Sequence, residues 1–138
     1  MGGGALIVLD THTIIWLLAT DRALGRRAKE TIDRGFVADQ VAVSAMTFWE
    51  VAMLRAKGRI ALQADVLSWR SDVLRLGIIE IPITGDIAIT AAQLPHFHGD
   101  PADRIIAATA LVNGATFLTA DRLMLAWKSK LRRFDARK

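Results

Sequence analysis

Four acidic residues are the side chains of this sequence with the clearest chemical potential. Asp10 directly follows an apolar run, and Asp121 comes two residues after another. Glu50 and Asp103 stand among apolar neighbours. Burying a charge among apolar residues costs free energy unless the charge is paired or binds a metal. Carboxylates brought together repel one another unless a cation lies between them, and Mg²⁺ and Mn²⁺ prefer oxygen ligands. We therefore expect these four acids to form a Mg²⁺ or Mn²⁺ site.

A divalent ion held by carboxylates can activate water, bind a phosphate and stabilise a leaving oxygen. Each acid also has a structural alternative. Asp10 and Asp121 could cap helices, Asp103 could interact with a helix dipole, and Glu50 could lie on a solvated helix face. Asp100 precedes Pro101 and is the natural cap of the helix that follows. The metal-site hypothesis therefore depends on whether the four acids converge.

The composition bounds the class of protein. The 138 residues are the size of one domain, and 52% hydrophobic residues can bury a core. The absence of cysteine excludes disulfides, thiolate metal sites and cysteine nucleophiles, and it fits a cytoplasmic protein. A net charge of +4 suits an anionic partner such as nucleic acid. We find no secretory signal and no apolar run long enough to span a membrane.

Hydrophobic patterning predicts strands that alternate with helices. The expected strands are residues 5–9, 41–44, 78–83, 116–119 and 131–134, and the expected helices are residues 11–19, 24–34 with Gly35 as the stop, 46–57, 64–76, 86–94, 101–112 and 121–127. This order predicts a three-layer α/β/α domain with a central, mostly parallel sheet. We expect a single domain over residues 5–135, a flexible N-terminus over residues 1–4 and a basic tail over residues 136–138.

The predicted topology brings the acids together. Sites in open parallel sheets form outside the carboxyl ends of the strands, and right-handed crossovers bring successive strand ends to the same edge. Asp10 and Asp121 follow strand ends directly. Glu50 and Asp103 lie near the beginnings of two helices that should start at this edge of the sheet.

Four segments around these acids resemble, in family order, the PIN-domain ribonucleases, and most closely the VapC-type toxins of bacterial toxin–antitoxin pairs. These segments are residues 9–13 (LDTHT) followed by Trp16-Leu17, residues 44–50 (SAMTFWE), residues 98–110 (HGDPADRIIAATA) and residues 118–122 (LTADR). The resemblance covers nearly the whole chain, and each segment contains one of the four acids. The third segment is the most specific match.

The resemblance implies a Mg²⁺- or Mn²⁺-dependent endoribonuclease that acts as the toxin of such a pair. It also implies a homodimer and inhibition by a small cognate antitoxin. Asp10 and Asp103 would be the main metal ligands, and Glu50 and Asp121 would complete the acidic pocket directly or through water. RNA phosphodiesters would be hydrolysed by metal-activated water.

Further residues of the same segments have expected roles beside the acids. The hydroxyls of Thr11 and Thr119 could orient a carboxylate or a water molecule. Asp100 could be a helix cap, an outer acid of the site, or both. Arg104 and Arg122 could meet RNA phosphates or form surface ion pairs.

Two other regions bear on nucleic acid and partner binding. The last eleven residues contain six Lys or Arg and one Asp, a pattern typical of a mobile, solvated end that could attract RNA electrostatically. The helices around Trp16 and Trp49 are candidates for antitoxin or dimer contacts, or for core packing.

Three alternative functions stay open at this point. A phosphotransfer domain of α/β fold also places an Asp after a strand, but position 12 is His where a haloacid-dehalogenase site needs a second Asp. A non-catalytic nucleic-acid-binding module would have no reason to retain four mutually repelling acids. A DNA nuclease would use the same metal chemistry, and RNA is favoured only by the resemblance.

Overall fold

A computed structural model describes residues 6–97 and 99–138. The elements in chain order are β1 (Ile7–Leu9), α1 (Thr11–Ala19), α2 (Arg26–Val37), β2 (Val41–Ser44), α3 (Ala45–Ala56), α4 (Val66–Arg75), β3 (Ile79–Ile81), α5 (Gly85–Ala92), α6 (Pro101–Val112), β4 (Thr116–Thr119), α7 (Arg122–Ala126) and β5 (Arg132–Asp135). The expected residue 5 of the first strand and the N-terminal residues 1–4 lie outside the described residues. No helix in the described ranges is long and apolar enough to cross a membrane.

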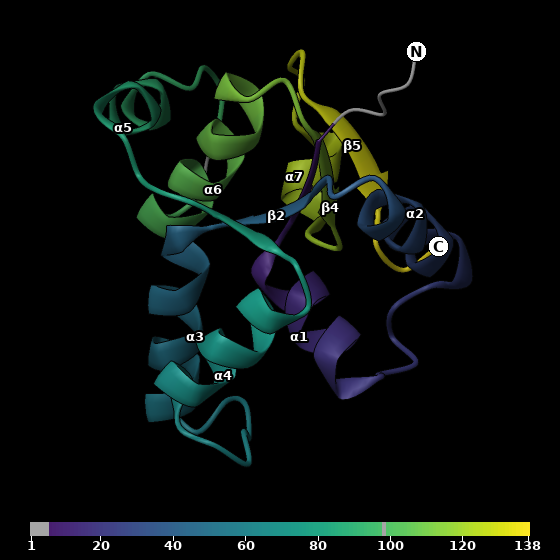
Figure 1. The fold of residues 1–138 in the computed structure, drawn as a ribbon. Helices are drawn as coiled ribbons and strands as arrows, with labels where there is room; N and C mark the ends of the chain where they lie inside the picture. The colour runs from purple at the N-terminus through teal and green to yellow at the C-terminus, as the bar shows by residue number, and fades with distance from the viewer. Residues whose placement is uncertain (1–5, 98) are drawn as a thin grey trace.

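The five strands form one sheet in the order β3-β2-β1-β4-β5, and every neighbouring pair is parallel (Figure 1). The central strand β1 pairs with β2 on one side and β4 on the other. Its last residue, Leu9, lies opposite Leu118 of β4. The predicted α/β fold with a parallel sheet is therefore confirmed.

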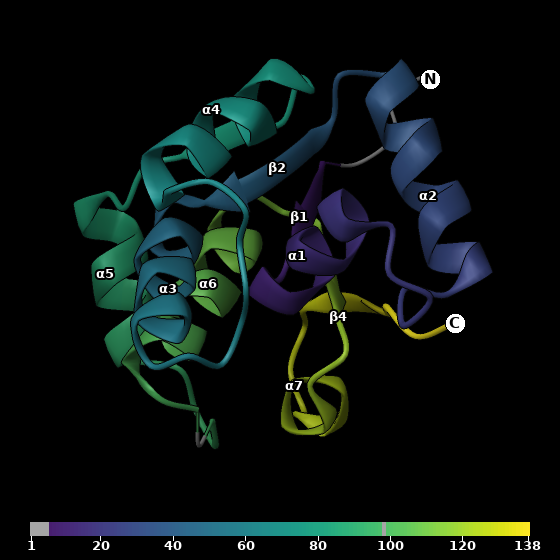
Figure 2. The same ribbon diagram turned by 90° about the horizontal axis from the view of Figure 1, so that it is seen from below.

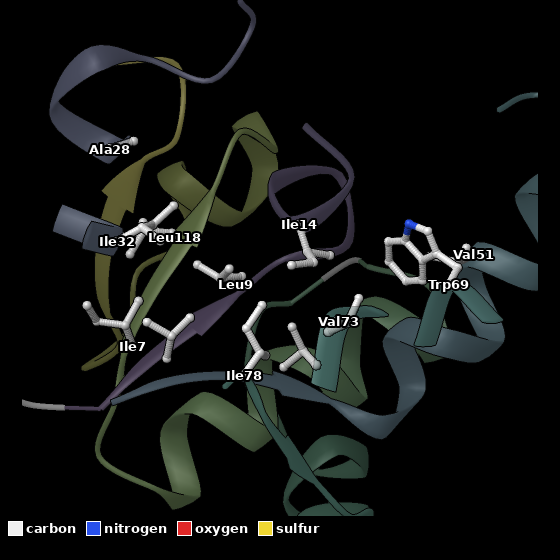
Figure 3. Packing of buried hydrophobic residues seen from close by; sticks show 12 residues of the cluster. Ile7, Leu9, Ile14, Ala28, Ile32, Val51, Trp69, Val73, Ile78 and Leu118 are labelled. Atoms are coloured by element: carbon white, nitrogen blue, oxygen red, sulfur yellow. The ribbon is translucent and has the colours of Figure 1, made fainter. Parts of the chain in front are cut away.

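Alternate strand residues supply two separate cores. On one face Ile7 and Leu9 pack with residues of α1, α2 and α4, and Figure 3 shows this cluster around Ile14, Ile32 and Val73. On the other face lies a second cluster, made of Val8, Ala42, Phe117 and residues of α6 and α7 together with Leu94, Phe97 and Leu131. Helices thus cover both faces of the sheet, and α5 packs outside α6 (Figures 1 and 2).

Helix α2 does not end at Gly35, as the sequence predicts, but continues to Val37. A Cβ at Gly35 would lie 2.8 Å from Cγ2 of Val41 and 2.9 Å from Cδ1 of Ile7. The glycine therefore allows the helix backbone to approach β1 and β2 closely. Helix packing against the sheet outweighs the low helix propensity of glycine here.

The end of the chain is tied to the domain rather than standing free of it. Ala136 is buried, and its N–H donates to Thr119 O at 2.9 Å. The N–H groups of Gly25 and Arg27 donate to Ala136 O and Lys138 O, each at 2.8 Å. Residues 136–138 therefore continue along the sheet edge beside α2.

We expect Gly35→Leu to destabilise the fold by about 1–3 kcal/mol, because the new side chain would overpack the interface between α2 and the sheet. Chemical denaturation followed by tryptophan fluorescence measures this change. Ala38→Leu is the matched control, since residue 38 is exposed at the end of the same helix. Equal stability of the two variants would contradict the close-packing role of Gly35.

Candidate active site

Asp10 stands at the carboxyl end of β1 and caps α1. Its Oδ1 accepts the N–H of Thr11 at 2.8 Å, and its Oδ2 accepts the hydroxyl of Thr119 at 2.6 Å. The residue is only 8% exposed. The Thr11 N–H of α1 and the Thr119 hydroxyl of β4 therefore orient the two carboxylate oxygens at the carboxyl edge of the sheet.

Glu50 reaches the same edge from α3. The hydroxyl of Thr11 donates to its Oε1 at 2.5 Å and also lies 3.2 Å from the hydroxyl oxygen of Thr47. Thr47 and Glu50 are three residues apart and share a face of the helix. Thr11 thus links two acids, because its N–H binds Asp10 and its hydroxyl binds Glu50.

Asp103 lies in the first turn of α6, after Pro101 at the start of the helix. Asp100 is the N-cap, and its Oδ1 accepts the N–H of Asp103 at 2.8 Å. The capping role expected for Asp100 is therefore present, and its side chain also lines the acidic cavity described below.

Asp121 caps the short helix α7. Its Oδ1 accepts the N–H groups of Leu123 at 2.8 Å and Met124 at 3.3 Å. Its own N–H donates to the hydroxyl oxygen of Thr119 at 3.0 Å. Thr119 therefore connects the Asp10 and Asp121 loops, as Thr11 connects Asp10 with Glu50.

These acids line one cavity of about 450 Å³. Its lining residues are Asp10, His12, Trp16, Glu50, Met53, Leu54, Lys57, Arg59, Asp100, Asp103, Ala120, Asp121 and Arg137. The structure thus brings together all four predicted acids and Asp100.

The electrostatics of the cavity reflect this crowding. Burial raises the pKa of the Asp10 carboxyl, against the lowering effect of the Thr119 and Thr11 hydrogen bonds. Burial, with the charges of Asp10 and Asp100, also raises the pKa of Glu50. The pKa of Asp103 rises to about 7, through burial first and then the charges of the neighbouring acids. These are carboxylates that a cation would stabilise in their charged form.

The donor set fits a hard divalent cation. Within residues 6–97 and 99–138, no group of three or more histidine or acidic side chains is arranged to hold an ion directly. Mg²⁺ does not need such a group, because it keeps several waters and often binds only one or two carboxylates. Asp10 and Asp103 could bind directly, with Glu50 and Asp121 acting through water.

The two expected RNA-binding arginines differ in their surroundings. The guanidinium of Arg104 donates to Ala91 O at 2.9 Å and Phe97 O at 2.8 Å, with longer bonds to two further carbonyls. Arg104 therefore braces the loop between α5 and α6, and this geometry does not support the expected contact with phosphates. Arg122 is exposed at the start of α7 and does not line the cavity, so its role stays a prediction.

Sequence reasoning missed one residue that supports Glu50 from outside the cavity lining and several that line the cavity. The structure identifies Thr47 through its contact with Thr11. Its spacing of three residues from Glu50 in a predicted helix could have indicated that the two side chains share a face. Lys57, Arg59 and Arg137 form a cationic part of the lining. The basic end of the sequence pointed to Arg137, but nothing in the pattern placed it beside the acids.

The fold and the acidic site define a PIN domain. The family model for the PIN domain matches residues 7–126, so the chain belongs to this family, and the resemblance seen in the sequence is confirmed. Ribonuclease VapC22 of Mycobacterium tuberculosis is 38% identical over 117 residues, which cover 84% of this chain and 87% of that protein.

Solved structures show the same fold. The complex of VapBC2 from Rickettsia felis with a DNA fragment from its promoter aligns with a TM-score of 0.70 at 13% identity, covering 94% of this chain and 99% of that chain. FitAB bound to an IR36 DNA fragment aligns with a TM-score of 0.66 at 26% identity, covering 96% of each chain.

The raised pKa of Asp103 predicts how stability depends on pH. The folded protein holds the Asp103 proton up to about pH 7, whereas the unfolded chain releases it near the ordinary value of 3.8. Between these values the folded state binds more protons, so the free energy of unfolding falls as the pH rises. Without divalent metal, Asp103→Asn should be about 1–2 kcal/mol more stable than wild type at pH 8, after allowance for solvent screening.

Denaturation in EDTA at pH 4 and pH 8 measures this difference, which should nearly vanish at pH 4. Asp86→Asn, an exposed acid on α5, is the control and should give no such gain at pH 8. A variant Asp103→Asn that is less stable than wild type at pH 8 would contradict the assignment of Asp103 to a repelling cluster.

Proposed function

We propose that this protein is a Mg²⁺- or Mn²⁺-dependent endoribonuclease that acts as the toxin of a toxin–antitoxin pair. The convergence of Asp10, Glu50, Asp103 and Asp121 in one cavity is the observation that carries the proposal. The 38% identical relative is named a ribonuclease, and similar solved folds belong to toxin–antitoxin complexes. RNA is therefore favoured over DNA as the substrate by similarity.

The chain's own residues would bind and orient the reacting groups. A bound divalent ion would supply Lewis-acid polarisation of the phosphate and a lowered pKa for water. Hydrogen bonds from Thr11 and Thr119 restrict the side chains of Asp10 and Glu50 and would orient them toward a bound ion. Without metal, burial and the neighbouring acids raise the pKa of Asp103 to about 7, and a bound ion would hold this carboxylate in its charged form.

Substitution of Asp10 by Asn should abolish RNA cleavage, with a loss of at least about 100-fold, because the neutral amide is a poor metal ligand. The assay is cleavage of a mixed RNA pool by purified protein with Mg²⁺ or Mn²⁺, and with EDTA. Asp86→Asn, outside the cavity, is the matched control and should cleave like wild type. Near-full activity of Asp10→Asn, or RNA cleavage in EDTA, would contradict the proposed mechanism.

The proposed partners are a cognate antitoxin and a second copy of the chain. Trp49, next to Glu50 on α3, is 53% exposed and therefore offers a large apolar side chain to such a partner. For the homodimer, light scattering coupled to gel filtration should give twice the chain mass of 15.1 kDa. A single-chain mass at micromolar concentration would contradict the dimer.

A further inference from the structure

The acidic cavity has a second wall of opposite charge. Lys57, Arg59 and Arg137 line it together with the acids, and we refer to these three residues as the cationic rim. The ion pairs within the described residues lie elsewhere and include no member of the rim. The rim therefore does not neutralise the acids by direct contact, and its positive charges remain available to a ligand.

Arg137 is held in place by two contacts of its guanidinium and one of its backbone. Its Nη1 donates to Ala120 O at 2.6 Å, directly before Asp121, and the guanidinium lies 5.8 Å from the ring centroid of Trp16. Its backbone N–H donates to Asp135 Oδ1 at 2.9 Å. Because the preceding Ala136 is buried against Thr119, the arginine is directed to the cavity by the sheet itself.

Lys57 and Arg59 come from the turn that ends α3. The N–H of Lys57 donates to Met53 O at 3.0 Å, and that of Arg59 donates to Leu54 O at 2.9 Å. Gly58 between them has a φ of 69°, which closes the turn. The turn brings both cations to the cavity from the helix that also provides Glu50.

The two parts of the rim come from different elements of the fold. In both views α1, which begins directly after Asp10, lies between α3 and the C-terminus (Figures 1 and 2). The cations of the rim therefore come from two elements on opposite sides of α1, the helix that begins beside Asp10. This arrangement matches a chain of negative charges that crosses the acidic cluster.

We propose that the cationic rim binds the backbone phosphates on the two sides of the scissile bond, with Arg137 on one side and Lys57 and Arg59 on the other. This inference rests on the proposed ribonuclease function and names how its substrate is held. The acids alone would repel the neighbouring phosphates of an RNA strand, and the rim offsets that repulsion. The planar guanidinium of Arg137 donates to one carbonyl and has further N–H groups for a phosphate, whereas that of Arg104 donates to four carbonyls.

The experiment measures RNA binding separately from cleavage. All proteins carry Asp10→Asn to prevent turnover, and the probe is a fluorescein-labelled, random-sequence 12-nucleotide RNA with Mg²⁺ present. Fluorescence anisotropy gives Kd over a series of NaCl concentrations. Arg137→Ala is compared with Lys138→Ala, and Arg59→Ala with Arg55→Ala. Each control removes the same charge from the same segment but lies outside the cavity lining.

Arg137→Ala and Arg59→Ala should each weaken binding about fivefold to tenfold at low salt. Each should also reduce the slope of log Kd against log salt by about 0.7, the value for one phosphate contact on a single strand. The two controls should stay close to the parent protein. Arg137→Lys should recover part of the affinity, because it restores the charge but not the planar group.

Equal losses in rim variants and controls would overturn the proposal in favour of bulk charge. Unchanged binding, with or without a lower Tm, would overturn it in favour of a purely structural role for Arg137. If wild type cleaves no RNA with either metal, the proposed ribonuclease function is refuted. If wild type cleaves RNA but the rim variants bind it like their controls, only the proposed phosphate-binding role of the rim is refuted.

Discussion

The parallel pairing of β1 with β4 is the constraint on which the site depends. The pairing ends with the N–H of Asp10 donating to Leu118 O at 2.9 Å, which places Thr119 beside the Asp10 carboxylate. The Thr119 hydroxyl then binds Asp10 and accepts the N–H of Asp121. A shift of the register by one residue would turn Thr119 to the opposite face and break its contact with Asp10. The geometry of Asp10 thus follows directly from strand pairing, and that of Asp121 follows from the local turn after β4.

The site stores charge repulsion that the rest of the fold must offset. Burial and mutual repulsion raise the pKa of Asp10, Glu50 and Asp103, so the acids oppose folding near neutral pH until a cation binds. Two apolar cores, one on each face of the sheet, supply the opposing stabilisation. Helix caps and threonine hydroxyls hold the carboxylates in place, so the capping residues Asp10, Asp100 and Asp121 also line the acidic cavity.

The strand–helix alternation could be predicted because it depends on local signals. The convergence of the acids could be predicted because parallel-sheet topology brings strand ends to one edge. Asp10 and Asp121 follow apolar runs, and Pro101 marks the start of the helix that holds Asp103. Three features could not be predicted because they depend on contacts between distant segments. Gly35 looks like a helix stop until the sheet it packs against is known. The guanidinium of Arg104 is bonded to a loop that periodicity does not position. Arg137 reaches the cavity only through the pairing of β5 with β4.

Direct measurement of cation binding tests the central claim, that these carboxylates form a divalent metal site. Titration calorimetry with Mn²⁺ on metal-free protein requires no knowledge of the RNA target. The account predicts saturable binding by wild type and at least about tenfold weaker binding by Asp10→Asn, with Asp86→Asn unchanged. Absence of binding by folded wild type, or equal affinity in wild type and Asp10→Asn, would contradict it.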